Sequence, residues 1–156
     1  MKKLFLVFSI AVSSFGFGQD YGDSLVKKDF LSSETIERYI VFYINEERVK
    51  LGLDTLTVLS EIDDIAKNHS AWMLQTRKYQ HSALNIDEII MKSGKCSNRY
   101  SHKFFARAVV NGWMDSPGHR AHIVNPENKY IGVGMSYTIR QSDGYISYYY
   151  TCTFDQ

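Results

Sequence analysis

The sequence predicts an α+β domain in which helices pack against an antiparallel pair of strands. Two observations indicate this class: segments with helical spacing of apolar residues come first, and segments with strict alternation come last. The chain has 156 residues, which is enough for one domain with one hydrophobic core. Helices followed by a hairpin are typical of helices packed on one sheet.

Residues 1–18 are expected to be an export signal. Lys2 and Lys3 precede the apolar run Leu4 to Val12, and the small residues of Gly16-Phe17-Gly18 follow it. The apolar run is too short, and too soon broken by serine and glycine, to predict a spanning helix. An uncleaved anchor is the alternative. We expect a secreted, periplasmic or extracellular protein with no transmembrane segment in the mature chain.

The mature chain is expected to have an irregular segment, residues 19–32, followed by the folded domain, residues 33–156. The leader holds two of the 18 lysines and arginines and none of the 17 acidic residues, so the mature chain is nearly neutral. This balance lacks the basic surface of nucleic-acid-binding proteins, and we expect no nucleic-acid partner.

A first helix is expected from Ser33, as the N-cap, to a stop at Gly52. Glu34 and Glu37 in the first turn favour the positive end of the helix dipole. The apolar side chains that share one helical face are Ile36, Tyr39, Ile40, Tyr43 and Ile44.

A second helix is expected over residues 60–78, with Ser60 and Asp63 as an approximate capping pair. His69 falls inside its apolar stripe, and we interpret it as a core histidine with one hydrogen bond. The stripe consists of Ile62, Ile65, Ala66, His69 and Met73.

The segment 79–100 has no clear period and is expected to be loop with short structured pieces. A third helix is expected over residues 103–114, and Ser116-Pro117-Gly118 ends it before a short extra turn at 119–124. The side chains expected on its buried face are Phe105, Ala108, Val109 and Trp113.

Two alternating segments, 131–138 and 146–154, predict the final strands, joined at the turn signal Asp143-Gly144. The tyrosines of the last strand are expected to pack on the sheet. Lining of a ligand groove is the alternative for them.

Cys96 and Cys152 are the only cysteines. In an oxidising compartment a lone pair favours a disulfide, and we expect one here. The alternative is two unpaired thiols buried as small apolar side chains.

The five histidines belong to no short zinc motif, and the chain contains no glycine-rich phosphate loop or nucleophile elbow. The most unusual segment is Trp113 to Ile123. It resembles the W-x-x-S-P-G-H-R-x-x-I signature of bacterial CAP domains, relatives of the cysteine-rich secretory proteins, antigen 5 and plant pathogenesis-related proteins. Further pieces resemble the family in the same order, at residues 44–53, 56–73, 79–82, 131–134 and 149–154.

The resemblance implies an α-β-α sandwich, with a central antiparallel sheet between helical layers. It also implies a cleft where two histidines and two acids meet, a set that binds zinc in many members. His81 and His119 carry over as the two histidines, which suit a zinc-type ion.

The acids of the family site do not carry over directly. Asn98 matches the family asparagine, which leaves Ser97 in the place of the first acid and Ser116 in the place of the second. Glu88 substitutes for the first acid if the loop is threaded differently. The expected metal set is therefore His81, His119 and Glu88, with a divalent ion such as zinc bound weakly.

The resemblance implies a binding or effector module whose cleft takes a small apolar ligand, a lipid or a protein partner. The cleft would be lined by His81, His119, Ser97, Asn98 and Ser116. The alternative is a hydrolase, with Ser82 or Ser116 as nucleophile and a cleft histidine as base.

Overall fold

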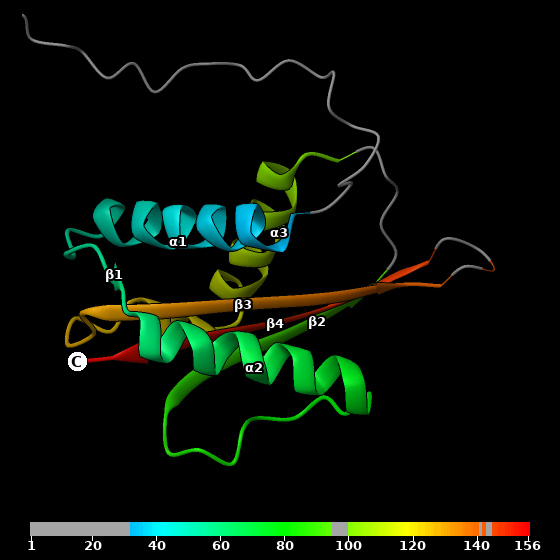
Figure 1. The fold of residues 1–156 in the computed structure, drawn as a ribbon. Coiled ribbons are helices and arrows are strands. Elements are labelled where there is room, and N and C mark those ends of the chain that lie inside the picture. The colour runs from blue at the N-terminus through cyan, green and yellow to red at the C-terminus, as the bar shows by residue number, and fades with distance from the viewer. Residues whose placement is uncertain (1–31, 95–99, 141, 143–144) are drawn as a thin grey trace, which may run out of the picture.

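The computed structural model describes residues 32–94, 100–140, 142 and 145–156. Figure 1 shows a sheet with α2 on one face and the other helices on the opposite face, which confirms the α-β-α sandwich. The elements run in the order α1 (Ser33–Lys50), β1 (Thr57–Val58), α2 (Ser60–Thr76), β2 (Asp87–Gly94), α3 (His102–Met114), α4 (Pro117–Ile123), β3 (Tyr130–Ile139) and β4 (Ile146–Asp155).

The sheet has the strand order β1-β3-β4-β2. The two long pairings, β3 with β4 and β4 with β2, are antiparallel as expected. The two-residue β1 pairs with β3 in parallel, with Thr57 opposite Tyr130. The sheet is therefore mixed, and most of the outer edge of β3 has no strand beside it among the described residues.

Strand β2 lies in the segment for which the sequence indicated loop, so that expectation was wrong. Both faces of this strand are covered: Ile89 is fully buried and Ile90 is 3% exposed. A strand buried on both faces does not alternate in hydropathy, which removes the signal of period two.

The helices form where expected, and their caps differ. Ser32, not Ser33, caps α1, because its hydroxyl accepts from the backbone N–H of Thr35 at 3.2 Å. The N-cap of α2 is Leu59, which makes no side-chain cap bond. The carboxylate of Asp63 accepts instead from the backbone N–H of Val133 at 2.9 Å, which joins α2 to β3.

Helix α3 begins at His102, one residue before the expected start, and Ser101 caps it. Ala108 is exposed, contrary to expectation, because the buried face is turned toward Ala106 and Val110. The seven-residue α4 begins at Pro117 itself, and it is longer than the single turn expected at 119–124.

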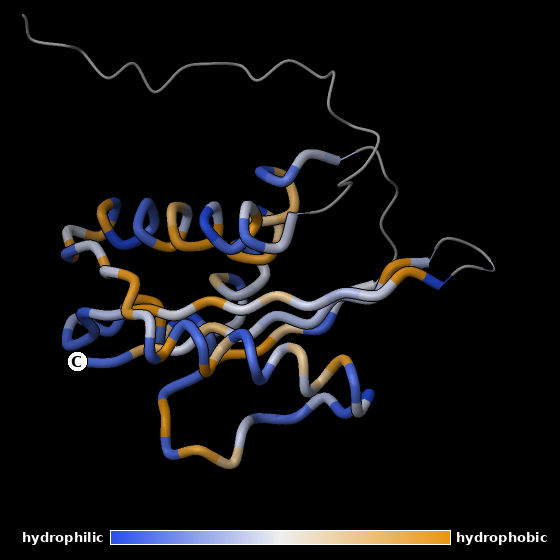
Figure 2. The backbone as a smooth tube through the Cα atoms, viewed as in Figure 1, coloured by the Kyte–Doolittle hydropathy of each residue, from blue (hydrophilic) through white to orange (hydrophobic). Residues whose placement is uncertain are grey.

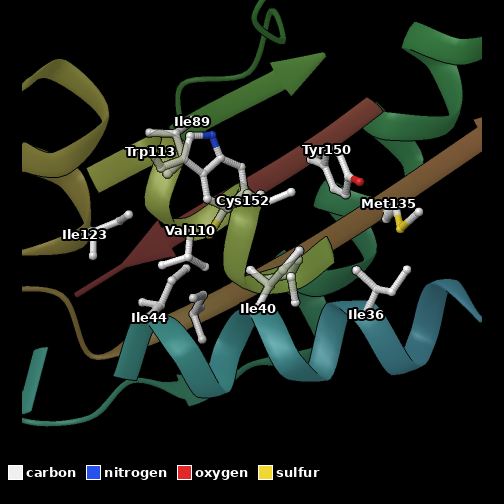
Figure 3. Close-up of a cluster of buried hydrophobic side chains, with 14 of the residues drawn as sticks. Ile36, Ile40, Ile44, Ile89, Val110, Trp113, Ile123, Met135, Tyr150 and Cys152 are labelled. Carbon is white, nitrogen blue, oxygen red and sulfur yellow. The ribbon is translucent and has the colours of Figure 1, made fainter. Parts of the chain in front are cut away.

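The main core lies between the sheet and the α1, α3 and α4 layer (Figure 3). Trp113 is fully buried there, and its indole N–H points at the carbonyl of Ile90, 3.4 Å away. The other large side chains that meet it include Ile36, Ile40, Ile44, Ile89, Ile123, Tyr148, Tyr150 and Phe154. The expected sheet packing of the β4 tyrosines is confirmed.

The expected Cys96–Cys152 disulfide is not what the structure shows. Cys152 is a free thiol with no exposed surface, opposite Ile89 and Val133 on the neighbouring strands. Burial, with smaller effects from nearby carboxylates, raises the pKa of this thiol well above its usual value. A thiol in the middle of an apolar core behaves as a small apolar side chain. Cys96 lies outside the described residues.

Arg48 joins the end of α1 to the segment after α4. Its guanidinium is fully buried and donates to four backbone carbonyls, those of Asp54, Ile123, Asn125 and Asn128, at 2.7–3.3 Å. Because every one of these bonds is to backbone, this side chain holds the shape of the loops and the position of α4.

Some expectations fall outside the described residues. These are the export signal at 1–18, the irregular segment up to residue 31 and the Asp143-Gly144 turn. Within the described ranges, no helix has both the length and the apolarity needed to cross a membrane. Figure 2 shows polar and apolar residues interleaved along every helix.

Gly132 and Gly134 allow α2 to lie directly on β3. A Cβ at Gly134 would collide with the backbone of Ala66 and Lys67, and one at Gly132 with the backbone of Ile62 and Asp63. Two glycines that are two residues apart point to the same face of the strand, and together they let the helix backbone approach the strand closely.

We expect Gly134→Ala to lower the free energy of unfolding by at least about 2 kcal/mol, because backbone atoms on both sides resist the added methyl group. Gly118→Ala is the matched control. Nothing lies within 4 Å of a Cβ at Gly118, and alanine in a helix is favoured over glycine by up to about 1 kcal/mol. Urea unfolding of the two variants measures both effects. Equal stability of the two would contradict the close contact.

Two carboxylates cover the open edge of β3. The Glu37 carboxylate accepts from the backbone N–H of Met135 at 2.8 Å, two residues beyond the N–H that Asp63 accepts from. Lys67 lies between them, 2.7 Å from Asp63 and 4.0 Å from Glu37. Burial raises the pKa of the Glu37 carboxyl, and the Met135 N–H and Lys67 only partly offset this.

Because the pKa of Glu37 is higher in the folded state, the folded protein keeps this proton at a pH where the unfolded chain has lost it. Wild type therefore loses stability as the pH rises from about 4.5 through the folded pKa. We expect the stability of Glu37→Gln relative to wild type to increase over that range in urea unfolding. Glu34→Gln, an exposed charge on the same helix, is the control. A relative stability of Glu37→Gln that falls with pH would reverse the assignment.

Candidate functional site

The first feature of the candidate site is a histidine–carboxylate pair at the start of β2. Glu88 is 6% exposed, and its Oε1 lies 3.1 Å from Nδ1 of His81. The same oxygen accepts from the backbone N–H of Ser82. A carboxylate on Nδ1 fixes the orientation of the imidazole and favours its tautomer with the other ring nitrogen free of a proton.

A second pair lies beside the first, on the opposite face of the sheet. Asp87 contacts Nδ1 of His122 on α4, and the imidazole stacks on Phe154 with ring centroids 6.5 Å apart. Successive strand residues point to opposite faces, so Asp87 and Glu88 serve the two layers separately. Sequence reasoning missed this pair; the Asp-Glu doublet was the only available signal.

His119 lies on α4 and is affected by the charges of both histidines of these pairs. Its pKa is lowered, first by burial and then by the positive charges of His122 and His81. These interactions mean that His81 and His119 share one electrostatic neighbourhood, although 37 residues separate them in the sequence. His119 is neutral over a wider pH range than an exposed histidine.

Three buried polar atoms near these pairs have no hydrogen-bond partner among the described residues: Oε2 of Glu88, Nδ1 of His119 and Oγ of Ser82. Buried polar atoms without a partner are rare in folded proteins, so each marks a place where water or a ligand atom is needed. The sequence had indicated all three positions, Glu88 and His119 as metal-site residues and Ser82 as a candidate nucleophile.

The residues present do not fit the metal that the resemblance implies. In the part of the chain that the structure describes, no three histidine, cysteine, aspartate or glutamate side chains are arranged to hold an ion. Nδ1 of His81 is already engaged by Glu88. Ser116 is half-buried at the N-cap of α4 and makes no capping bond. Ser97 and Asn98 lie outside the described residues.

A pocket of about 410 Å³ opens next to the His81–Glu88 pair, between α2 and the segment 80–84. Trp72 is one of its lining side chains, and its indole stacks on His69 with ring centres 5.6 Å apart. The lining residues are Ile65, Asn68, His69, Trp72, Gln80, His81, Ser82, Ala83 and Leu84. We call this cavity the α2 pocket.

The segment that closes the α2 pocket is anchored at three points. Nε2 of His69 bonds the carbonyl of Gln80 at 3.0 Å, and the hydroxyl of Tyr79 donates to the carbonyl of Ile90 at 3.2 Å. The third anchor is the bond from Ser82 to Glu88. His69 is 8% exposed with this one hydrogen bond, so its interpretation as a core histidine is confirmed. The anchors preform the pocket.

The family model that matches the chain is that of the cysteine-rich secretory protein family, CAP, over residues 41–154. Among solved structures, an outer surface protein from Borrelia burgdorferi has a TM-score of 0.58 at 16% identity, over 81% of this chain and 96% of that one. An extracellular protein with an SCP domain from Bacillus anthracis has a TM-score of 0.52 at 18% identity, over 76% of this chain and 40% of that one. These two show the fold alone.

Two bacterial sequences are also similar to the chain. The uncharacterized protein YkwD of Bacillus subtilis is 31% identical over 111 residues, which are 66% of this chain and 43% of YkwD. An uncharacterized protein of Borreliella burgdorferi is 26% identical over 160 aligned residues, 92% of this chain and 90% of that protein. The chain thus spans less than half of YkwD and nearly all of the second relative.

We expect zinc to bind this site far more weakly than it binds structural zinc sites, where binding supplies about 10–16 kcal/mol. The reason is that the described residues provide two imidazoles and one engaged carboxylate. Isothermal titration of wild type and of the His81→Ala, His119→Ala double variant measures this. Tight binding that the double variant abolishes would contradict the expectation and would establish a metal centre at these histidines.

Proposed function

The chain belongs to the cysteine-rich secretory protein (CAP) family, and on that premise we propose that it is an exported binding module whose α2 pocket takes a small, largely apolar ligand. Export is supported by the basic start, apolar run and small residues of 1–18. It is supported further by two structural relatives, one named as an outer surface protein and one as extracellular.

The observation that carries the proposal is the α2 pocket itself. Its volume of about 410 Å³ falls in the range of small-molecule sites, about 300–1,000 Å³. Ile65, Trp72 and Leu84 supply apolar walls, and Leu84 is 57% exposed in the free protein. Covering these side chains with an apolar ligand removes their surface from water, which favours binding by roughly 25 cal/mol per Å².

The polar end of the pocket predicts the shape of the ligand. The Ser82 hydroxyl is buried without a partner among the described residues, and His81 stands at the rim with 61% of its side chain exposed. A ligand with a hydroxyl or a protonated carboxyl group at its end would satisfy both, because it can accept from the Ser82 hydroxyl and donate to Nε2 of His81. The supported class is therefore an apolar body with a single polar head, which includes lipids and other small amphipathic molecules.

A hydrolase is the second candidate, favoured by the His81–Glu88 pair. A carboxylate that orients an imidazole is one half of a catalytic triad. The other half, a hydroxyl hydrogen-bonded to the free imidazole nitrogen, does not occur among the described residues, and Ser82 and Ser116 both lack such a bond. Hydrolysis of p-nitrophenyl acetate that His81→Ala abolishes would favour this candidate over the binding module.

We expect the neutral apolar dye Nile red to bind the wild-type protein, and Trp72→Ala to weaken that binding about tenfold. The substitution removes a wall of the pocket, and burying a large side chain contributes roughly 1.5–3 kcal/mol. Fluorescence titration measures the affinity. Mass spectrometry of organic extracts of both purified proteins then identifies the natural ligand.

Phe42→Ala is the matched control for this experiment. Phe42 is 59% exposed on α1 and does not line the α2 pocket, so its loss removes a similar apolar surface elsewhere. We expect this variant to bind the dye as wild type does. Equal weakening by both substitutions would show that the dye binds apolar surface without specificity, and the proposal would fail.

A further inference from the structure

A second hollow lies where the sheet extends beyond α2. The helix ends at Thr76, whereas β3 and β4 continue past its last turn, as Figure 1 shows on the side away from the C-terminus. The uncovered sheet face and the end of α2 enclose a volume of about 410 Å³. We call this cavity the distal hollow. It shares no lining residue with the α2 pocket.

The distal hollow is lined by cations. Arg77 comes from the end of α2, Lys92 from β2 and Arg140 from the end of β3, and the described lining contains no carboxylate. The end of one helix and two different strands thus each place a positive side chain around one cavity. Arg77 and Lys92 carry like charges, so placing both at one cavity raises its local affinity for an anion.

Arg77 and Lys92 differ from several other cations of the domain. Lys67 pairs with Asp63, and Arg107 pairs with Glu46. Within the described ranges, no carboxylate lies within ion-pair distance of either Arg77 or Lys92. Their charges are therefore available to an external anion.

Aromatic rings hold two of these cations at the wall of the hollow. Lys92 lies directly opposite Tyr149 in the strand pairing, and its ammonium stands 5.2 Å from the centre of that ring. The guanidinium of Arg140 stands 5.1 Å from the ring centre of Tyr145. Because a ring face takes up none of the N–H donors of an ammonium, Lys92 keeps its donors for oxygen ligands.

Arg77 has an unusual backbone. Its φ of 59° lies in the left-handed region, and it is the only residue other than glycine with a positive φ among those described. Glycine is preferred at this position after a helix, because a side chain adds steric strain there. Strain retained at one residue is a feature of functional positions. The left-handed turn ends the helix and places the Arg77 side chain at the hollow.

We propose that the distal hollow binds a phosphate monoester carried on an apolar or aromatic group. Arg77 and Lys92 together match the charge of a phosphate dianion, and the hydroxyls of Thr138 and Ser147 add hydrogen-bond donors for its oxygens. Leu74 and Tyr149 supply the surface against which the attached group packs. This site is separate from the α2 pocket, and its ligand is of a different class.

The test is a titration with phenyl phosphate, and phenol serves as the uncharged comparison. Calorimetry or amide chemical shifts measure the binding. We expect phenyl phosphate alone to bind, and added NaCl to weaken it, since the contacts are exposed ionic ones. Lys92→Gln is expected to weaken binding about tenfold, because a hydrogen bond between charged groups is about twice as strong as a neutral one. Lys78→Ala removes the same charge next to Arg77 but outside the lining, and is expected to bind as wild type does.

Arg77→Gly separates a binding role from a structural one. Glycine relieves the left-handed strain, so the melting temperature should rise while the affinity for phenyl phosphate falls about tenfold. A variant that is more stable and binds equally well would overturn the proposal, as would an equal effect of Lys78→Ala. Wild type that binds neither phenyl phosphate nor vesicles of phosphatidylcholine with phosphatidic acid would also overturn it.

The two phosphate sources are distinguished by the same variants. Binding of phenyl phosphate without vesicle binding assigns the site to soluble phosphate monoesters. Vesicle binding that depends on phosphatidic acid and is lost in Arg77→Gly and Lys92→Gln assigns it to a lipid headgroup. Both outcomes support the phosphate site.

Discussion

The backbone contact between α2 and β3 is the constraint on which the rest of the structure depends. Gly132 and Gly134 let the helix lie on the sheet without side chains between them. The rest of α2 then follows a fixed path, which brings His69 to within 3.9 Å of Glu88 on β2. Both proposed sites are formed by this path: the α2 pocket lies along the flank of the helix, and the distal hollow lies beyond its end.

The opposite layer is fixed by a different kind of interaction. Arg48 binds backbone carbonyls, and through them it sets the position of α4, which carries His119 and His122. The start of β2 therefore receives one histidine from each layer, His81 on Glu88 and His122 on Asp87. The glycine contact on one face and the Arg48 hydrogen bonds on the other thus position the layers that meet at Asp87 and Glu88. This explains why one strand end holds most of the ionisable groups of the site.

The sequence was most informative where burial of one face produces a regular spacing of apolar residues. The helices and the last two strands each bury one continuous face, so their positions could be predicted, with errors only at caps such as Ser32. Strand β2 could not, because both of its faces are covered. That omission also obscured Glu88: in a loop its direction was unknown, whereas its place in the strand puts it on the face of the sheet where it contacts His81. A pairing was expected for Cys152 from compartment and count, which say nothing of a side chain's direction, and the structure shows this cysteine as a free thiol inside the core.

The carboxylates along the outer edge of β3 also affect how copies of the protein meet one another. An unpaired strand edge is a template on which a second chain can add as a further strand, the first step of aggregation. Here Asp63 and Glu37 already occupy two of the backbone donors that such a strand would need. A strand from another molecule would have to displace two hydrogen-bonded acids. The short β1 thus leaves this edge of the sheet open in topology, while the two carboxylates hinder the addition of a further strand to β3.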